Sequence, residues 1–354
     1  MFSASSVHRG PLERREDGGR DGQNFGGEKM KALRFNNFGD LSVLHIEELP
    51  TPVPGPDEVL VQVHAASINP SDVKNVQGKM KQISLPRTPG QDFAGIIVAG
   101  AKKRIGEEVW GTGGDVGFTR DGSHAEFIVI PERGARPKPK SLSMIEAASV
   151  GRNYITAFFG LIRKAQLKEG ETVLVTGASG GVGSSVIKIA KSKNARVIAL
   201  YRRAPDPERA SRLGIDLALS TESDDIANRV KQFTGGQGVD VAVDCVGGGL
   251  FEVVLNTLGF GGRQVNITSV GERRVGFDLP DFYRRQITLF GINTITLDTI
   301  ASGDILDDLR DAFEQGRLTP PEIARTCSLE DALEAYRQVD SGTAGGKIVF
   351  TFPR

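Results

Sequence analysis

The sequence predicts an α/β protein with two domains, one rich in β-strands and one built on a doubly wound parallel sheet. The length of 354 residues suffices for about two domains of roughly 150 residues each. Strand-like runs without intervening helices fill the first part of the chain, which is typical of an antiparallel or barrel-like domain. From about Met144, helical stretches alternate with short apolar runs, which is typical of parallel strands covered by helices on both faces.

The β-rich part begins at about residue 30. Residues 59–65 alternate as a half-buried strand does. Residues 51–57 hold three prolines and must therefore be extended. Further strands are expected at the following ranges: 32–35, 43–49, 93–98, 108–110 and 125–130.

The parallel part is recognised by β-branched apolar runs that alternate with helical stretches. A helical stretch follows about Thr296, and a last strand at 347–352 is expected to return to the first domain. The predicted domains are therefore 30–150 with 297–354, and 151–296. Residues 1–29 are predicted to be a disordered extension, because they carry almost no apolar periodicity. The expected parallel strands are 172–176, 196–200, 239–244, 262–267 and 287–291.

Charge and composition exclude several classes of partner. The chain has 44 basic and 44 acidic residues, so no global positive field gathers nucleic acid or anionic lipid. No run of about 18 apolar residues is available to cross a membrane. Only two cysteines are present, and we see no signal peptide, so a cytoplasmic location is expected.

A glycine-rich loop is the most informative motif. The apolar strand at 172–176 runs into Gly177-Ala-Ser-Gly-Gly-Val-Gly183 and then into a helix, which is the arrangement that cradles a dinucleotide pyrophosphate. The alternative is a glycine-rich turn of an unrelated α/β domain, since Ala178 stands where the fingerprint has its first glycine. The predicted phosphate-binding residues are Ala178, Ser179, Gly180, Gly181, Val182 and Gly183.

The end of the next strand selects the nucleotide. An NAD site would carry an acidic residue there, whereas this chain has Tyr201, Arg202 and Arg203. Guanidinium groups pair with a 2′-phosphate, so NADPH is the expected cofactor. Two alternatives remain: the arginines could be solvated charges that open a helix, and Asp206 could serve the ribose of NAD.

Several further motifs make residues 30–354 resemble the medium-chain dehydrogenase/reductase superfamily, in its zinc-free quinone oxidoreductase and enoyl reductase branches. The resemblance implies a GroES-like β-rich catalytic domain plus a doubly wound Rossmann cofactor domain, with the active site in the cleft between them. The motifs are Ser67-Ile-Asn-Pro-Ser-Asp72, Gln77-Gly78, Pro89-Gly-Gln-Asp-Phe-Ala-Gly95, Gly122-Ser-His-Ala-Glu126, the loop at 177–183, Val243-Asp-Cys-Val-Gly247 and Gly345-Gly-Lys347.

The same comparison predicts that no metal takes part. Zinc-dependent members of the superfamily place a cysteine within the stretch that matches 68–72 and a His-Glu pair at Gln91-Asp92, and this chain has neither. Without a Lewis acid, alcohol oxidation is disfavoured. The expected function is hydride transfer from NADPH to a small electrophilic acceptor, either a quinone or an α,β-unsaturated carbonyl compound such as a 2-alkenal.

Two alternatives to this function stay open. The first is an enoyl-CoA or enoyl-thioester reductase, for which Lys79, Lys81 and Arg87 could contact CoA phosphates. The second is an NADPH-binding redox sensor without turnover. A homodimer is also expected, because the resemblance implies pairing through the apolar stretch 289–295, and an apolar edge strand must be covered.

The resemblance also implies site residues. Asn69 is the first catalytic candidate, because its amide could donate to a substrate carbonyl, although Asn-Pro is also a turn signal. Tyr154 is the second, as a proton donor, because the tyrosine expected after Gln77-Gly78 is absent; the alternative is a tyrosine packed at the domain junction. Asp72 is expected to cap a helix. The remaining cofactor contacts implied are Thr156, Val246, Ile267, Ser269, Gly291, Asn293 and Lys347.

Overall fold

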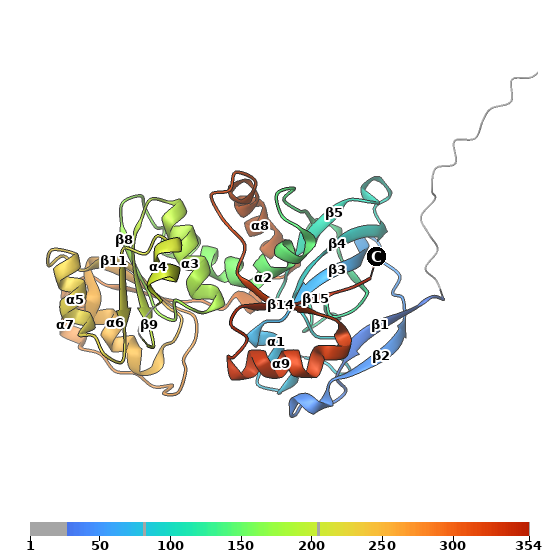
Figure 1. Cartoon of the computed structure of the whole chain (residues 1–354), viewed down its shortest axis with the longest axis horizontal. Coiled ribbons are helices and arrows are strands. Elements are labelled where there is room, and N and C mark those ends of the chain that lie inside the picture. The colour runs from blue at the N-terminus through green and yellow to red at the C-terminus, as the bar shows by residue number, and fades with distance from the viewer. Residues whose placement is uncertain (1–26, 81–82, 204–205, 354) are drawn as a thin grey trace, which may run out of the picture.

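The computed structural model describes residues 27–80, 83–203 and 206–353, and these form two lobes side by side (Figure 1). One lobe holds a seven-stranded sheet and a two-stranded sheet, and the other holds a six-stranded parallel sheet. The predicted pairing of a β-rich domain with a doubly wound parallel sheet is confirmed. The predicted extension lies largely outside the described residues, and the first strand begins at Lys29.

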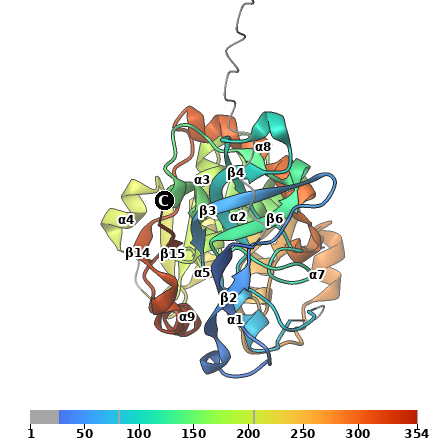
Figure 2. The same ribbon diagram turned by 90° about the vertical axis from the view of Figure 1, so that its right-hand side faces the viewer.

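The β-rich lobe consists of β1–β7, β14 and β15. β3 lies at its centre, paired with β4, β6 and β15, all antiparallel (Figure 2). The last strands of the chain therefore complete a sheet that the first strands begin. The bounds are β1 (Lys29–Arg34), β2 (His45–Pro50), β3 (Glu58–Ser67), β4 (Asp92–Ala99), β5 (Glu108–Gly111), β6 (Phe127–Pro131), β7 (Arg136–Pro137), β14 (Ile323–Cys327) and β15 (Lys347–Thr351).

The parallel lobe contains β8–β13 in the order β10-β9-β8-β11-β12-β13. In such a sheet the strand order reverses between β8 and β11, and ligands bind outside the carboxyl ends of the strands at this point. The bounds are β8 (Thr172–Val175), β9 (Arg196–Tyr201), β10 (Leu217–Ser220), β11 (Val239–Asp244), β12 (Leu258–Asn266) and β13 (Thr288–Gly291). β10 is a strand that the sequence interpretation missed.

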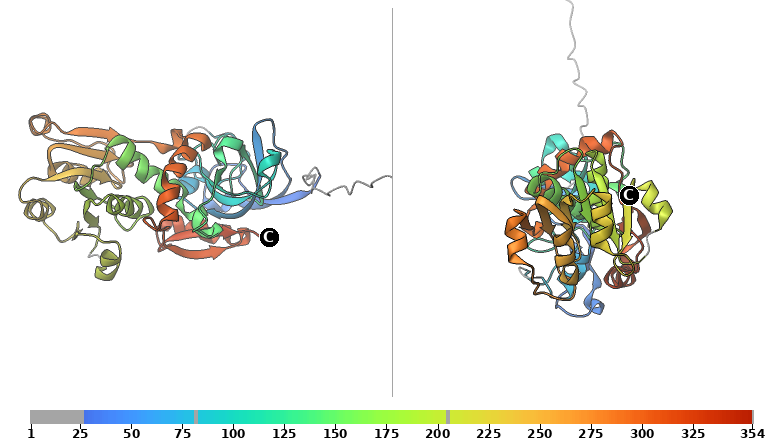
Figure 3. Two further views of the ribbon diagram at one scale, coloured as in Figure 1. Left: turned by 90° about the horizontal axis from the view of Figure 1, so that it is seen from above. Right: turned by 90° about the vertical axis from the view of Figure 1, so that its left-hand side faces the viewer.

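Helices fill the connections, and those that link the parallel strands lie around the parallel sheet (Figure 3). The α-helices are α1 (Pro70–Val76), α2 (Met144–Phe158), α3 (Gly181–Ser192), α4 (Pro207–Arg212), α5 (Ile226–Phe233), α6 (Phe251–Thr257), α7 (Leu279–Arg284), α8 (Thr299–Glu314) and α9 (Ala332–Ser341). A π-helical turn at Phe159–Lys164 extends α2. Within the described ranges, no helix is long and apolar enough to cross a bilayer.

Helix α2 joins the two lobes. It contacts β3 and β4 of the β-rich lobe and α3 of the parallel lobe. Its start is fixed by a capping box, in which the Ser143 hydroxyl accepts from the Glu146 amide and the Glu146 carboxylate accepts from the Ser143 amide. The helix bends at Gly151, whose backbone is not helical. One buried apolar cluster spans the junction, from Trp110 on β5 to Val243 on β11.

Candidate active site

A cleft of about 690 Å³ opens between the lobes, and both contribute to its walls. Asn69 and Lys347 line it from the β-rich lobe, Arg152 and Thr156 from α2, and residues 179–182 from the loop before α3. The cleft therefore lies where the reversal of strand order places a ligand site.

The glycine-rich loop has the geometry of a phosphate cradle. Gly177 adopts a left-handed backbone (φ +60°), and Gly180 is the N-cap residue of α3, which therefore begins without any side-chain cap. The first amides of α3 are thus free to point at an anion, and the helix dipole favours negative charge there. A Cβ on Gly183 would lie 2.3 Å from the Gly177 oxygen, so only glycine allows this close approach.

The loop residues divide into two groups. Ser179, Gly180, Gly181 and Val182 line the cleft, whereas Ala178 and Gly183 do not. Ala178 is buried, its amide donates to the Leu200 carbonyl, and Gly183 packs against Gly177. These two positions shape the loop rather than face a ligand.

The residues predicted to select the nucleotide lie at the end of β9. The Tyr201 side chain is largely buried, and burial raises the pKa of its phenol. Arg202 and Arg203 are exposed, and Nε of Arg202 lies 3.2 Å from a Glu222 carboxylate oxygen. None of the three is among the residues that line the cleft. Arg209 of α4 is, and the sequence interpretation missed it, although it continues the basic run after β9.

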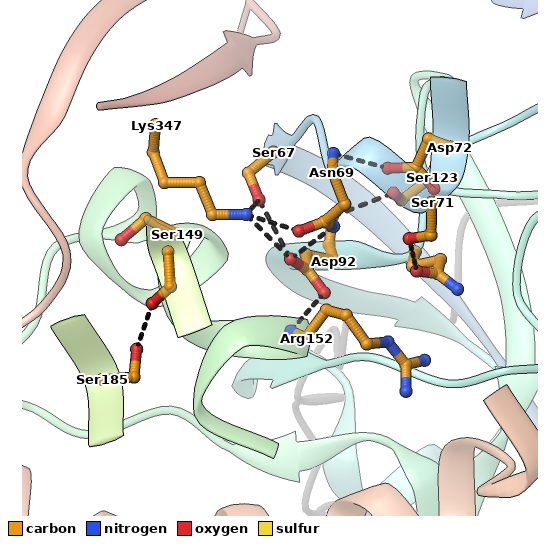
Figure 4. A network of polar contacts seen from close by, with 12 residues as sticks. Ser67, Asn69, Ser71, Asp72, Asp92, Ser123, Ser149, Arg152, Ser185 and Lys347 are labelled. Atoms are coloured by element: carbon orange, nitrogen blue, oxygen red, sulfur yellow. Dashed lines mark hydrogen bonds and ion pairs between the residues drawn. The ribbon is translucent and has the colours of Figure 1, made fainter. Parts of the chain in front are cut away.

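A buried polar network forms the floor of the cleft (Figure 4). Asp92 Oδ2 accepts from Ser67 Oγ at 3.0 Å and from Asn69 Nδ2 at 2.8 Å, and the Arg152 amide donates to Asp92 Oδ1 at 2.8 Å. Nζ of Lys347 lies 3.4 Å from the same carboxylate and donates to Ser67 Oγ at 3.0 Å and to Asn69 Oδ1 at 2.7 Å. The network fixes the orientation of the Asn69 amide at the cleft wall.

Charge pairing explains the pKa shifts in this network. Burial alone would raise the pKa of Asp92, but the ammonium of Lys347 and the hydrogen bond from Asn69 hold this pKa below its usual range. Burial lowers the pKa of Lys347, and Asp92 opposes that shift. Asp72 accepts from the Asn69 amide at 2.8 Å, as expected of a helix cap, and burial together with the charge of Asp92 raises its pKa to about 7.

The proton-donor role predicted for Tyr154 is wrong. The side chain is buried away from the cleft, its hydroxyl donates to the Thr319 carbonyl at 2.5 Å, and its ring packs against Phe313. Burial also raises the pKa of its phenol. The reason is helical geometry: residues two apart on a helix point about 200° apart, so Tyr154 and Thr156 cannot both face the cleft.

Some of the other predicted cofactor residues line the cleft, and some do not. The Thr156 and Thr294 hydroxyls share a hydrogen bond of 2.9 Å, and Ile267, Asn293 and Lys347 line the same cleft. Three further predicted residues do not line it, namely Val246, Ser269 and Gly291; Val246 instead packs over Gly177, and the Ser269 hydroxyl donates to the Glu272 carbonyl.

The donor set of the cleft does not fit a zinc ion. Within the described ranges, no three His, Cys, Asp or Glu side chains gather in an arrangement that could hold a metal. Asp92, at the position of a family zinc-site residue, is occupied by the network around Lys347. His124 is buried against Tyr336, and burial lowers its pKa to about 4, so its ring is neutral at physiological pH.

Comparison with known proteins agrees with the two-lobed fold and the cleft between the lobes. Family models match the alcohol dehydrogenase GroES-like domain over residues 55–140 and the zinc-binding dehydrogenase family over residues 181–307. The first match covers β3 to β7 of the β-rich lobe, and the second runs from the start of α3 through the rest of the parallel lobe into α8.

Three curated relatives extend over nearly the whole chain. A zinc-type alcohol dehydrogenase-like protein of Schizosaccharomyces pombe is 35% identical, over 88% of this chain and 94% of its own length. The 2-methylene-furan-3-one reductase of Solanum lycopersicum is 31% identical, over 91% and 79%, and the human (Homo sapiens) quinone oxidoreductase is 27% identical, over 92% and 98%.

A solved structure, that of the JamJ enoyl reductase in its apo form, superposes with a TM-score of 0.76 at 27% identity, over 92% of this chain and 100% of that one. The lobes are accordingly a GroES-like domain and a Rossmann domain, and the protein is an oxidoreductase of a fold that uses a nicotinamide cofactor. The chain belongs to the medium-chain dehydrogenase/reductase superfamily, in the branch of the quinone oxidoreductases and enoyl reductases.

Proposed function

We propose that the protein is an NADPH-dependent, zinc-independent oxidoreductase that reduces quinones or α,β-unsaturated carbonyl compounds. The observation that carries the proposal is that the phosphate loop and the buried Asn69–Asp92–Lys347 network open on one cleft. Within this network the Asn69 amide is a donor suited to a carbonyl oxygen. The names of the tomato and human relatives, an enone reductase and a quinone oxidoreductase, support the same chemistry.

The choice of NADPH rests on the charge around the end of β9. Arg202, Arg203 and Arg209 supply three guanidinium groups there, which suits a 2′-phosphate. The carboxylate of Asp206 accepts from the Glu208 amide at 3.0 Å and caps α4, which gives this residue a structural role in the helix.

The residues of the chain act mainly by positioning the cofactor and the acceptor. A nicotinamide cofactor, when bound, supplies the hydride. Residues 179–182 would hold its pyrophosphate, and Thr156 and Asn293 would flank the nicotinamide end. The Asn69 amide uses one N–H on Asp92, which leaves its second N–H to donate to a carbonyl oxygen of the acceptor.

Measuring the consumption of NADPH and NADH with an ortho-quinone, a para-quinone, a short 2-alkenal and an enoyl-CoA tests the proposal. We expect turnover with a quinone or the alkenal, faster with NADPH than with NADH. The double variant R202Q/R203Q should raise the KM for NADPH by about 10-fold or more, as the loss of charge-assisted hydrogen bonds predicts, without changing that for NADH. Equal rates with NADH would refute the choice of cofactor, and cofactor binding without turnover would favour a sensor.

An enoyl-thioester reductase is the second candidate, favoured by the similarity to the JamJ enoyl reductase. The cationic patch suggested for CoA is weakened in this structure, because Arg87 is engaged by Asp121 at 3.3 Å and by Ser84. Lys81 lies outside the described residues, and Lys79 is exposed. Turnover of the enoyl-CoA faster than of every quinone or alkenal would select this candidate.

We also propose that two copies pair through the edge strand β13. Large apolar side chains lie exposed near it on β12 and α7: Phe260 is 73% exposed, Leu279 60% and Tyr283 57%. Apolar edges and patches of this kind need a cover. Sedimentation should give a dimer for the natural chain and a monomer for Leu279→Glu, and a monomeric natural chain would contradict the pairing.

A further inference from the structure

Arg152 is a buried cation in the wall of the cleft that none of the roles above uses. It follows the bend at Gly151, where its own amide donates to Asp92. Its side chain is 6% exposed and lines the cleft, and its guanidinium extends away from Asp92 (Figure 4). A charge in this position is costly unless it is paired.

The guanidinium is left short of partners. Nη1 donates to the Thr294 carbonyl at 2.9 Å, whereas Nε and Nη2 are buried without a hydrogen-bond partner among the described residues. These two nitrogens form one edge of the planar group, the edge that donates two parallel hydrogen bonds to an oxygen-bearing ligand. Buried donors without partners are rare and call for a ligand.

No carboxylate of the described residues forms a direct ion pair with this cation. Arg34, the other buried arginine of that part of the chain, forms an ion pair with Asp121 at 2.9 Å, but Arg152 has no ion pair within 4 Å. The nearby Asp92 is already matched by Lys347. Asp92, Asp72 and Asp115 stabilise this cation only at longer range, and burial lowers the pKa of Arg152. Among the described residues, no carboxylate therefore occupies the edge formed by Nε and Nη2.

The position of Arg152 indicates which part of a ligand it meets. Its bond to Thr294 places it beside the Thr156–Thr294 hydroxyl pair, which is the end of the cleft expected to hold the nicotinamide. The phosphate end, by contrast, is lined by residues 179–182 and by Arg209. A group next to the nicotinamide meets the acceptor.

We infer that Arg152 binds the acceptor oxygen that becomes negatively charged during hydride transfer. The inference rests on the proposed function. Hydride brings two electrons to the acceptor carbon of an enone or to the quinone; the π electrons move onto the carbonyl oxygen, and NADPH becomes NADP⁺. The resulting enolate or quinolate oxygen accepts from Arg152, which keeps its own proton, and water supplies the proton that completes the product. Among the described residues only Nη1 of the guanidinium is hydrogen-bonded, which leaves Nε and Nη2 to donate to this oxygen.

Kinetics of Arg152→Met and Arg152→Lys test the assignment. Loss of one donor to a developing oxyanion typically lowers kcat by about 100-fold or more, so R152M should fall by that factor while the KM for NADPH stays unchanged. R152K keeps the charge but loses the planar fork, so an intermediate loss is expected. The control is Arg163→Met, which removes an exposed arginine paired with Asp308 and should leave kcat unchanged. An unchanged kcat in R152M with the same acceptor would overturn the inference.

A spectroscopic titration gives an answer that does not depend on turnover. The dead-end probe is 4-nitrophenol bound to the NADP⁺-loaded protein, because its yellow phenolate form reports a positive charge at the phenol oxygen. The natural chain should lower the pH midpoint of the bound phenol, and R152M should restore the midpoint of the free phenol; R152K guards against misfolding of R152M and should retain part of the lowering. The same midpoint in all three proteins, or a weaker Kd for NADPH as the main effect of R152M, would overturn the inference.

The two measurements also separate the inference from the proposed function. Failure of the natural chain to consume NADPH with any acceptor would count against the proposed function. The nitrophenol midpoint would still decide whether Arg152 is an anion site.

Discussion

Replacing Lys347 by Met should leave the buried carboxylate of Asp92 without its cationic partner. Asp92 is completely buried, and Lys347 is its only cationic side chain within 4 Å among the described residues. Breaking a buried pair by removing one partner costs about 3–5 kcal/mol, because the remaining charge stays uncompensated. The network also loses the hydrogen bonds from Nζ to Ser67 and Asn69. We therefore expect the free energy of unfolding at neutral pH to fall by about 3–5 kcal/mol.

Urea unfolding of K347M, of Asp92→Asn and of the double variant measures this coupling as a double-mutant cycle. The double variant should recover most of the loss, since neither member of this pair then remains as a charge without its partner. Lys138→Met is the matched control: Lys138 is equally buried but its carboxylate partner Glu108 is exposed, so about 1–2 kcal/mol should be lost.

The pKa of Asp92 also predicts how the free energy of unfolding changes with pH. In the natural chain the lowered pKa of Asp92 gives stability that is present above the unfolded pKa of about 3.9 and is lost as the pH falls through the folded value. Without Lys347, this pKa should rise above the unfolded value, so the deficit of K347M should shrink as the pH falls toward about 4. A loss no larger than that of K138M, or no recovery in the double variant, would refute the reasoning.

Three other changes test separate features. Asp72→Asn should remove a pH dependence of the free energy of unfolding. Because the pKa of Asp72 is raised to about 7, its ionisation destabilises the natural chain progressively as the pH rises above about 4. In urea unfolding, the natural chain should therefore lose stability relative to D72N between about pH 5 and 7. Tyr154→Phe should lose about 1 kcal/mol in thermal unfolding, through the bond to Thr319, with unchanged steady-state kinetics; a large loss of kcat would restore the proton-donor role. Gly151→Ala should lose about 1–3 kcal/mol in urea unfolding, because its Cβ would lie 2.1 Å from Asp92 Oδ1, and an unperturbed variant would show that α2 can shift.

The sequence was sufficient for the architecture because the two periodicities differ so clearly along the chain. Four of the expected parallel strands agree with the structure to within about one residue, since a buried parallel strand needs a continuous apolar run, whereas β12 begins at Leu258, earlier than the expected residue 262. β10 was missed because Leu217–Ser220 is short and only partly buried, which gives a weak local pattern.

The site could be predicted only where it is local in sequence. The phosphate loop is a contiguous motif, whereas the pairing of Asp92 with Lys347 joins residues that 254 others separate. Arg152 gave no signal because arginine is ordinarily an exposed residue, and nothing in a helical pattern marks one as buried. Tyr154 was assigned by proximity in sequence to Thr156, although helical geometry already placed the two side chains on different faces.

The position of β15 in the seven-stranded sheet has a consequence for biosynthesis. β3 and β4 leave the ribosome before the whole parallel lobe, but β15, which pairs with β3 and carries the counter-charge of Asp92, emerges only after that lobe. Domains fold during synthesis only when all their parts are present. The amino-terminal lobe must therefore wait, with an unpaired strand edge and an unneutralised aspartate, until β15 has emerged, whereas the Rossmann lobe, which precedes β15 in the chain, can already be folded. A nascent chain that stops short of Lys347 would thus present the chaperones of the cell with a finished second lobe and an unfinished first one.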